Sequence, residues 1–104
     1  SIAGLPTTSF VFLGFLPHKK GRQTLLKEIA GQGRTVVFYE SPHRIEKGLA
    51  SLAELLDASR QLVVCRELTT IHEEVIRGTP QEVASHFRAN PGTMRGEFVV
   101  IVAP

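Results

Sequence analysis

The side chains best suited to chemistry lie in one short segment, residues 40–44 (Glu-Ser-Pro-His-Arg), directly after an apolar and aromatic run over 35–39. Glu40 and His43 are candidate general bases, and the Arg44 guanidinium is a candidate donor to phosphate or carboxylate oxygens. The preceding run predicts a buried strand, so these groups would stand at its carboxyl end, where open α/β sheets bind ligands. A structural alternative stays open, in which Ser41 caps a helix and Glu40 pairs with Arg44.

A second segment supplies positive charge. His18, Lys19, Lys20 and Arg22 lie within five residues of one another in a loop punctuated by proline and glycine. Such a cluster suits contacts to backbone phosphates, which are sensitive to salt and blind to base sequence. The alternative is a solvated loop whose lysines serve solubility.

A third segment, residues 66–69 (Arg-Glu-Leu-Thr), ends another apolar run. The Thr69 hydroxyl is a candidate hydrogen-bonding group for a ligand. Arg66 and Glu67 are equally compatible with a structural ion pair.

Composition excludes several classes of protein. Of the 104 residues, 42% are hydrophobic, which predicts a packed core, and the net charge of +2 is too small for a generally polycationic protein. The single cysteine excludes an internal disulfide, the four histidines lack ligand spacing, and no glycine-rich nucleotide loop is present, so we expect no metal site. No apolar stretch approaches the ~18 residues of a membrane span. We therefore expect a cytoplasmic protein without membrane contact.

The elements that must position these groups follow from hydrophobic periodicity. Apolar runs predict strands over 10–13, 35–39, 62–65 and 98–102, and an alternating run predicts one over 73–77. Three helices separate them. The first ends at Gly31 and Gly33. The second begins with Ser41 as N-cap and Pro42 at its first position, and carries an apolar stripe of Ile45, Leu49, Leu52 and Leu56. The third opens on a capping box at 79–82. The fold class is therefore α/β, with a mixed parallel and antiparallel sheet of about five strands flanked by helices. We expect the strand over 35–39 to be covered on both faces. We expect the strands over 62–66 and 73–78 to pair antiparallel.

A set of short motifs occurs in a fixed order along the chain: 4–7 (Gly-Leu-Pro-Thr), 14–17 (Gly-Phe-Leu-Pro), 19–22 (Lys-Lys-Gly-Arg), 38–44 (Phe-Tyr-Glu-Ser-Pro-His-Arg), 66–69, 73–79 and 96–98 (Gly-Glu-Phe). In this order the chain resembles the C-terminal half of the ribosomal RNA small-subunit methyltransferase I family, a branch of the tetrapyrrole methylase superfamily. The chain starts at Ser1, not at a methionine. We expect residues 1–104 to be the C-terminal domain of a two-domain enzyme whose N-terminal cofactor-binding domain is absent from this chain.

The resemblance implies an activity and its partners. The family uses S-adenosylmethionine to methylate a cytidine ribose 2′-hydroxyl in 16S rRNA of the small ribosomal subunit, without a metal. Enzymes of this superfamily typically form homodimers. We expect the 104 residues alone to be inactive.

The resemblance also implies site residues. Those expected at the cofactor, in many cases through main-chain atoms, are Tyr39, Glu40, Ser41, Leu68, Thr69, Gly96, Glu97 and Phe98. Those expected to face the RNA are Lys19, Lys20, Arg22, His43 and Arg44. The general base is expected to be Glu40, His43 or a residue of the N-terminal half.

Two other functions remain open from the sequence. One is a tetrapyrrole or small-molecule methylase domain. The basic loop and the segment 40–44 are evidence against it. The other is a non-catalytic RNA-binding module, against which the small share of aromatic residues, 7%, counts because no base-stacking platform is visible.

Overall fold

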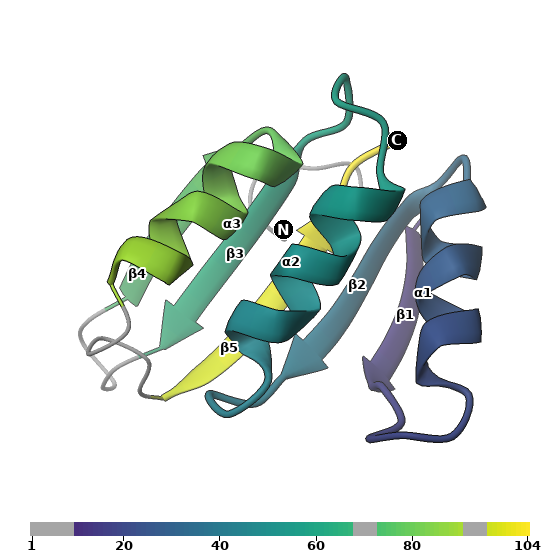
Figure 1. Ribbon diagram of the computed structural model, residues 1–104, viewed down its shortest axis with the longest axis horizontal. Coiled ribbons are helices and arrows are strands. Elements are labelled where there is room, and N and C mark those ends of the chain that lie inside the picture. Colours follow the sequence, from purple (N-terminus) through teal and green to yellow (C-terminus); the bar gives the residue numbers. More distant parts are fainter. Residues whose placement is uncertain (1–9, 68–72, 91–95) are drawn as a thin grey trace.

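The computed structural model describes residues 10–67, 73–90 and 96–104 of the chain. Strands and helices follow one another in the predicted order (Figure 1). They are β1 (Phe10–Phe15), α1 (Arg22–Gly31), β2 (Thr35–Glu40), α2 (Ile45–Leu55), β3 (Leu62–Glu67), β4 (Glu73–Gly78), α3 (Pro80–Ala89) and β5 (Glu97–Val102). Several strands extend one or two residues beyond the apolar runs that predicted them.

The five strands form one mixed sheet in the order β1-β2-β5-β3-β4. Strands β1 and β2 are parallel, whereas β2 with β5, β5 with β3, and β3 with β4 are antiparallel. The α/β class, the mixed sheet and the antiparallel pairing of β3 with β4 are confirmed. The last strand thus lies at the centre of the sheet.

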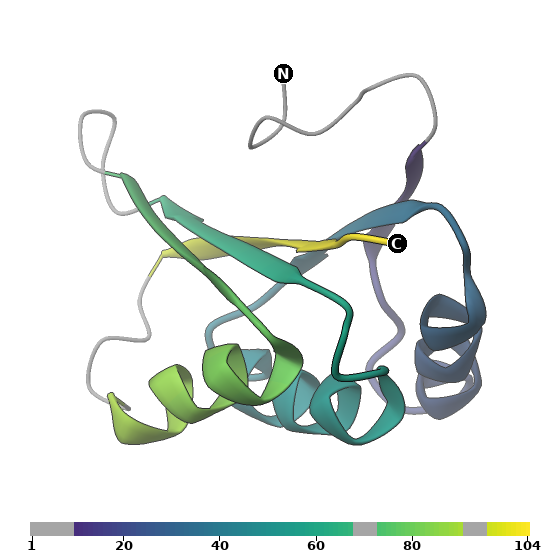
Figure 2. The ribbon, with the colours of Figure 1, turned by 90° about the horizontal axis from the view of Figure 1, so that it is seen from above.

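All three helices lie on one face of the sheet (Figure 2). The predicted stripe of α2 is buried throughout, with Leu52 fully buried and Leu56 the most exposed of the four at 7%. These side chains pack against Val36 and Phe38 of β2 in the main core. Each such side chain contributes about 1.5–3 kcal/mol to folding, so this helix is anchored firmly beside β2.

The opposite face of the sheet carries no helix among the described residues and is only partly covered. Val37, Val63 and Ile101 are buried there in a second, smaller cluster. Tyr39, further along β2, is 37% exposed. The prediction that the strand over 35–39 is buried on both faces is therefore correct as far as Phe38 and wrong for Tyr39.

An irregularity in β1 gives this open face its aromatic character. The pairing register of β1 with β2 shifts between Phe12 and Gly14, and Gly14 has φ 67°, a backbone conformation that favours glycine. Regular alternation would place Phe12 and Phe15 on opposite faces, because they are an odd number of residues apart. The bulge instead brings both rings against Tyr39, with centroid distances of 5.2 and 5.3 Å.

No helix within the described ranges is long and apolar enough to cross a bilayer.

Candidate functional site

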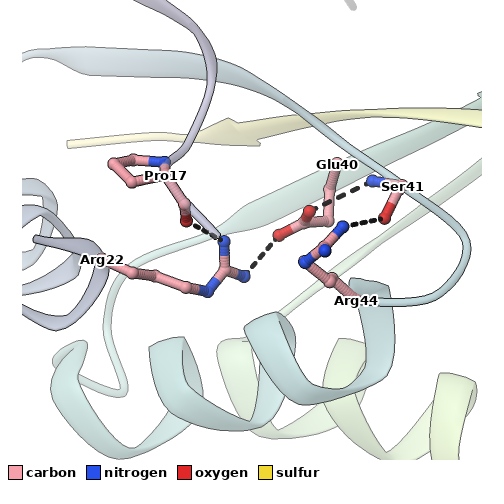
Figure 3. A network of polar contacts seen from close by, with 5 residues as sticks. All are labelled: Pro17, Arg22, Glu40, Ser41 and Arg44. Carbon is pink, nitrogen blue, oxygen red and sulfur yellow. Dashed lines mark hydrogen bonds and ion pairs between the residues drawn. The ribbon is translucent and has the colours of Figure 1, made fainter. Parts of the chain in front are cut away.

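The segment 40–44 lies at the carboxyl end of β2, as predicted, and forms a connected polar network with the start of α1 (Figure 3). Arg22 Nη2 lies 2.6 Å from Glu40 Oε2, and Arg22 Nη1 donates to the Pro17 carbonyl oxygen at 3.3 Å. The other carboxylate oxygen, Glu40 Oε1, accepts the Ser41 backbone N–H at 3.1 Å. Both oxygens of Glu40 are therefore engaged.

Burial strengthens this ion pair. The side chain of Glu40 is 4% exposed and that of Arg22 is 14% exposed. A charge removed from water in this way requires a partner, and here each supplies the other. The structural alternative in which Glu40 pairs with Arg44 is wrong. The partner of Glu40 is Arg22 of α1, which precedes β2 in the chain, whereas Arg44 follows β2.

A glycine of α2 makes room for the pair. Gly48 is buried, and a Cβ added there would lie 3.0 Å from both Arg22 Nη2 and Glu40 Oε2. That distance is tighter than nearly all real Cβ contacts. The absence of a side chain at residue 48 thus leaves room for the ion pair beside the helix.

The start of α2 differs from the prediction. The helix begins at Ile45, and its N-cap is Arg44 with no side-chain cap hydrogen bond. Residues 42–44 form a turn in which the Ser41 carbonyl accepts the N–H groups of Arg44 and Ile45. Ser41 is therefore not the N-cap, and Pro42 is not in the first helical turn. The Ser41 hydroxyl instead accepts Arg44 Nη1 at 3.1 Å, which fixes the guanidinium in place.

Among the residues expected at the cofactor, those that the structure describes lie at one edge of the sheet. In the strand register, Glu40 of β2 is opposite Phe98 of β5, Phe98 is opposite Arg66 of β3, and Arg66 is opposite Glu74 of β4. The end of β2 and the start of β5 are thus neighbours, as the resemblance requires. Leu68 and Thr69 lie outside the described residues.

The side chains at this edge point in different directions. Phe98 is fully buried, with its ring 5.4 Å from that of Phe87, so only its main chain is available to a ligand. Tyr39 belongs to the open face. Gly96, at φ 81°, and Glu97 are exposed.

A second ion pair completes the row across the sheet. Arg66 is 6% exposed, and its Nη2 lies 2.9 Å from Glu74 Oε1. Its Nε is buried and has no hydrogen-bond partner among the described residues. The pairing of Arg66 with its neighbour Glu67 stays a prediction, because the side chain of Glu67 lies outside what the structure describes.

A basic cavity of about 320 Å³ opens beside the Arg22–Glu40 pair, between the loop after β1 and one face of α2. Its lining has no carboxylate and consists of His18, Lys19, Arg22, Gln23, Arg44, Lys47 and Ser51. Three of the five residues expected at RNA, Lys19, Arg22 and Arg44, line it together. Lys20 and His43 are exposed but do not line it.

Three residues of the lining were not predicted: Gln23, Lys47 and Ser51. The missing signal was helical spacing, since Lys47 and Ser51 follow Arg44 by one and two turns on the same face of α2. In the parts of the chain that the structure describes, no group of three or more His, Cys, Asp or Glu side chains is placed to hold a metal ion.

The sequence profile described as Tetrapyrrole (Corrin/Porphyrin) Methylases matches residues 1–84. The chain belongs to this family. Among curated relatives, a protein of Halalkalibacterium halodurans is 46% identical over 96% of this chain. A protein of Synechocystis is 44% identical over 97% of this chain, and one of Mycobacterium tuberculosis is 44% identical over 98% of it. All three are named Ribosomal RNA small subunit methyltransferase I. The resemblance seen in the sequence is confirmed.

This tetrapyrrole methylase chain spans about a third of the length of those relatives, 34–36% of each. Solved structures of two methyltransferases share its fold. Cobalt precorrin-4 methyltransferase, a cobalamin biosynthetic enzyme, superposes with a TM-score of 0.64 at 16% identity, over 95% of this chain and 42% of its own. The methyltransferase CobJ gives 0.60 at 20% identity, over 90% and 40%.

Proposed function

We propose that the chain is the C-terminal domain of an S-adenosylmethionine-dependent methyltransferase that acts on a cytidine ribose 2′-hydroxyl of 16S rRNA. The observation that carries the RNA substrate is the carboxylate-free basic cavity beside the strand-end edge. Relatives named as rRNA methyltransferases at over 40% identity support the same substrate. The proposal includes a cytoplasmic homodimer that works on the small ribosomal subunit.

The residues at the strand-end edge fit one side of the cofactor. The exposed residues Gly96 and Glu97 directly precede Phe98, which is opposite Glu40 in the register, and the buried Arg66 Nε lacks an acceptor among the described residues. Hydroxyl or carboxylate oxygens of a bound cofactor are acceptors of the kind such an N–H requires. Tyr39, Glu40, Ser41, Leu68, Thr69, Gly96, Glu97 and Phe98 are proposed to hold it, and S-adenosylmethionine supplies a methyl group already activated by its sulfonium.

The protein's own part is then alignment and removal of a proton. Transfer requires the ribose oxygen to approach in line, which a fixed RNA backbone provides. His43 is exposed in the turn before α2, whereas both oxygens of Glu40 are engaged. We therefore propose His43 as the base supplied by this domain and assign Glu40 a positioning role through Arg22 and Ser41.

The proposal is tested with labelled S-adenosylmethionine and purified small ribosomal subunits. Two proteins are compared: the 104-residue chain, and a chimera in which it replaces the matching third of the H. halodurans relative. We expect label on one cytidine ribose with the chimera and none with the 104 residues alone. A folded chimera that binds the cofactor but labels no ribosomal RNA would overturn the proposal, and label on a tetrapyrrole instead would assign a small-molecule methylase.

A further inference from the structure

We infer that the basic cavity is a phosphodiester-binding site for an RNA strand, and that Lys47 of α2 is one of its principal contacts. This inference rests on the proposed function for the identity of the polymer. It assigns a binding residue outside the segments 14–22 and 40–44 that the sequence analysis singled out.

The first support is charge. Lys19, Arg44 and Lys47 line the cavity, and no carboxylate within the described residues pairs with any of them. By contrast, the less exposed Arg22 and Arg66 each pair with a glutamate. Three unpaired cations around one cavity repel one another until an anion binds.

The second support is the way the cavity is built. Arg44, Lys47 and Ser51 lie on one face of α2, and the Ser41 hydroxyl holds the Arg44 guanidinium at 3.1 Å. Arg22 is fixed by Glu40 and reaches the cavity wall from α1. Arg22 and Arg44 are thus held in place before a ligand binds, and these two donors lose little side-chain entropy on binding.

The lining also identifies the part of the ligand that is recognised. It combines cations with the hydroxyl of Ser51 and the amide of Gln23, and it contains no Phe, Tyr or aliphatic side chain. The imidazole of His18 is the one ring in this lining on which a nucleobase could stack, whereas phosphate oxygens find several charged and neutral donors. The volume of about 320 Å³ lies at the lower end of the range for small-ligand pockets, ample for a backbone phosphate with its sugar.

The test measures the affinity of the full 104-residue chain for a fluorescently labelled single-stranded RNA at several salt concentrations. Lys47→Ala is compared with Lys27→Ala, which removes the same charge from an exposed position of α1 that does not line the cavity. We expect Lys47→Ala to weaken binding about fivefold at ~0.1 M salt and to reduce the slope of log K against log salt by ~0.7, the value for one phosphate contact. Lys27→Ala should change affinity less than twofold, and Lys47→Arg should retain most of it.

Equal effects of the two alanine variants, or no binding by the wild-type chain, would overturn the inference. A second arm adds inorganic phosphate or cytidine monophosphate at matched ionic strength. If either one binds as tightly as the RNA, the site serves a small phosphate ligand and the RNA assignment is wrong. Ribosomal RNA methylation by the chimera separates the two proposals. If the chimera methylates ribosomal RNA while Lys47→Ala and Lys27→Ala bind RNA equally well, only the role of Lys47 is wrong. If the chimera does not methylate ribosomal RNA while RNA binding still depends on Lys47, only the proposed function is wrong.

Discussion

Arg22 and Glu40, eighteen residues apart in the chain, form an ion pair of 2.6 Å directly beneath Gly48 of α2. The pair joins the first turn of α1 to the end of β2 at the point where the basic cavity meets the strand-end edge. Its integrity therefore controls both halves of the candidate site.

Gly48→Ala should destabilise the fold by about 1–3 kcal/mol, because the new methyl group would lie 3.0 Å from both partners of the pair. Urea unfolding at neutral pH measures the change. Gly31→Ala is the matched control, since a Cβ there has nothing within 4 Å and alanine favours a helix. Equal stability of the two variants would show that the ion pair moves away without cost.

Glu40→Gln should lower the free energy of unfolding by about 3 kcal/mol, because it leaves the Arg22 guanidinium mostly buried without a counter-charge. Gln has one carbonyl oxygen in place of two carboxylate oxygens, so the effect reports the loss of the charge together with one acceptor. The double variant Glu40→Gln/Arg22→Met removes the orphaned charge and should recover part of the loss. A double variant no more stable than Glu40→Gln alone would contradict this account.

His43→Asn tests the proposed base in the chimeric enzyme. We expect the single-turnover rate of methyl transfer to fall about 10²–10⁴-fold, with the affinity for ribosomal subunits nearly unchanged. His86→Asn, on α3, serves as the control. A loss of affinity at an unchanged rate would instead make His43 an RNA contact, the other role that the sequence indicates.

Glu82→Gln should reduce the dependence of stability on pH in the acidic range. The Thr79 backbone N–H donates to Glu82 at 2.8 Å within the capping box of α3, and this hydrogen bond lowers the pKa of the Glu82 carboxyl. Because the pKa in the folded state is below the unfolded value of about 4.3, the carboxylate stabilises the protein above that pH. This stabilisation is lost as the pH falls through the folded-state pKa. Gln keeps the cap but cannot titrate.

Urea midpoints at pH 7 and pH 3 measure this effect. The wild-type protein should lose more stability between the two than Glu82→Gln does, and Glu54→Gln, on the exposed side of α2, should behave as the wild type. Identical losses in all three proteins would exclude a contribution from the capping carboxylate.

The elements of the fold were predictable because their signals are local. The spacing of Ile45, Leu49, Leu52 and Leu56 and the capping box at Thr79 are complete within one helix each, and both are confirmed. The turn after β2 was mispredicted because Ser41 has two possible hydrogen-bonding partners, a helix N–H and the Arg44 side chain, and only the tertiary structure selects between them.

The site depends on contacts between distant segments, which no local pattern encodes. The partner of Glu40 comes from α1, and the bulge at Gly14 that turns Phe15 toward Tyr39 is visible only in the pairing register of β1 with β2. Arg60 is a similar case. Its side chain donates to the carbonyl oxygens of Ala30 and Ala103, which joins the end of α1 to the residues after β5.

The position of β5 between β2 and β3 has a consequence for how the chain acquires its structure. Until residues 97–102 have left the ribosome, the sheet consists of two separate pairs, β1 with β2 and β3 with β4, which share no strand neighbour. The last strand then joins them by hydrogen bonds on both of its sides. Closure of the sheet therefore requires β5 and depends on pairing across a long sequence separation, which slows folding.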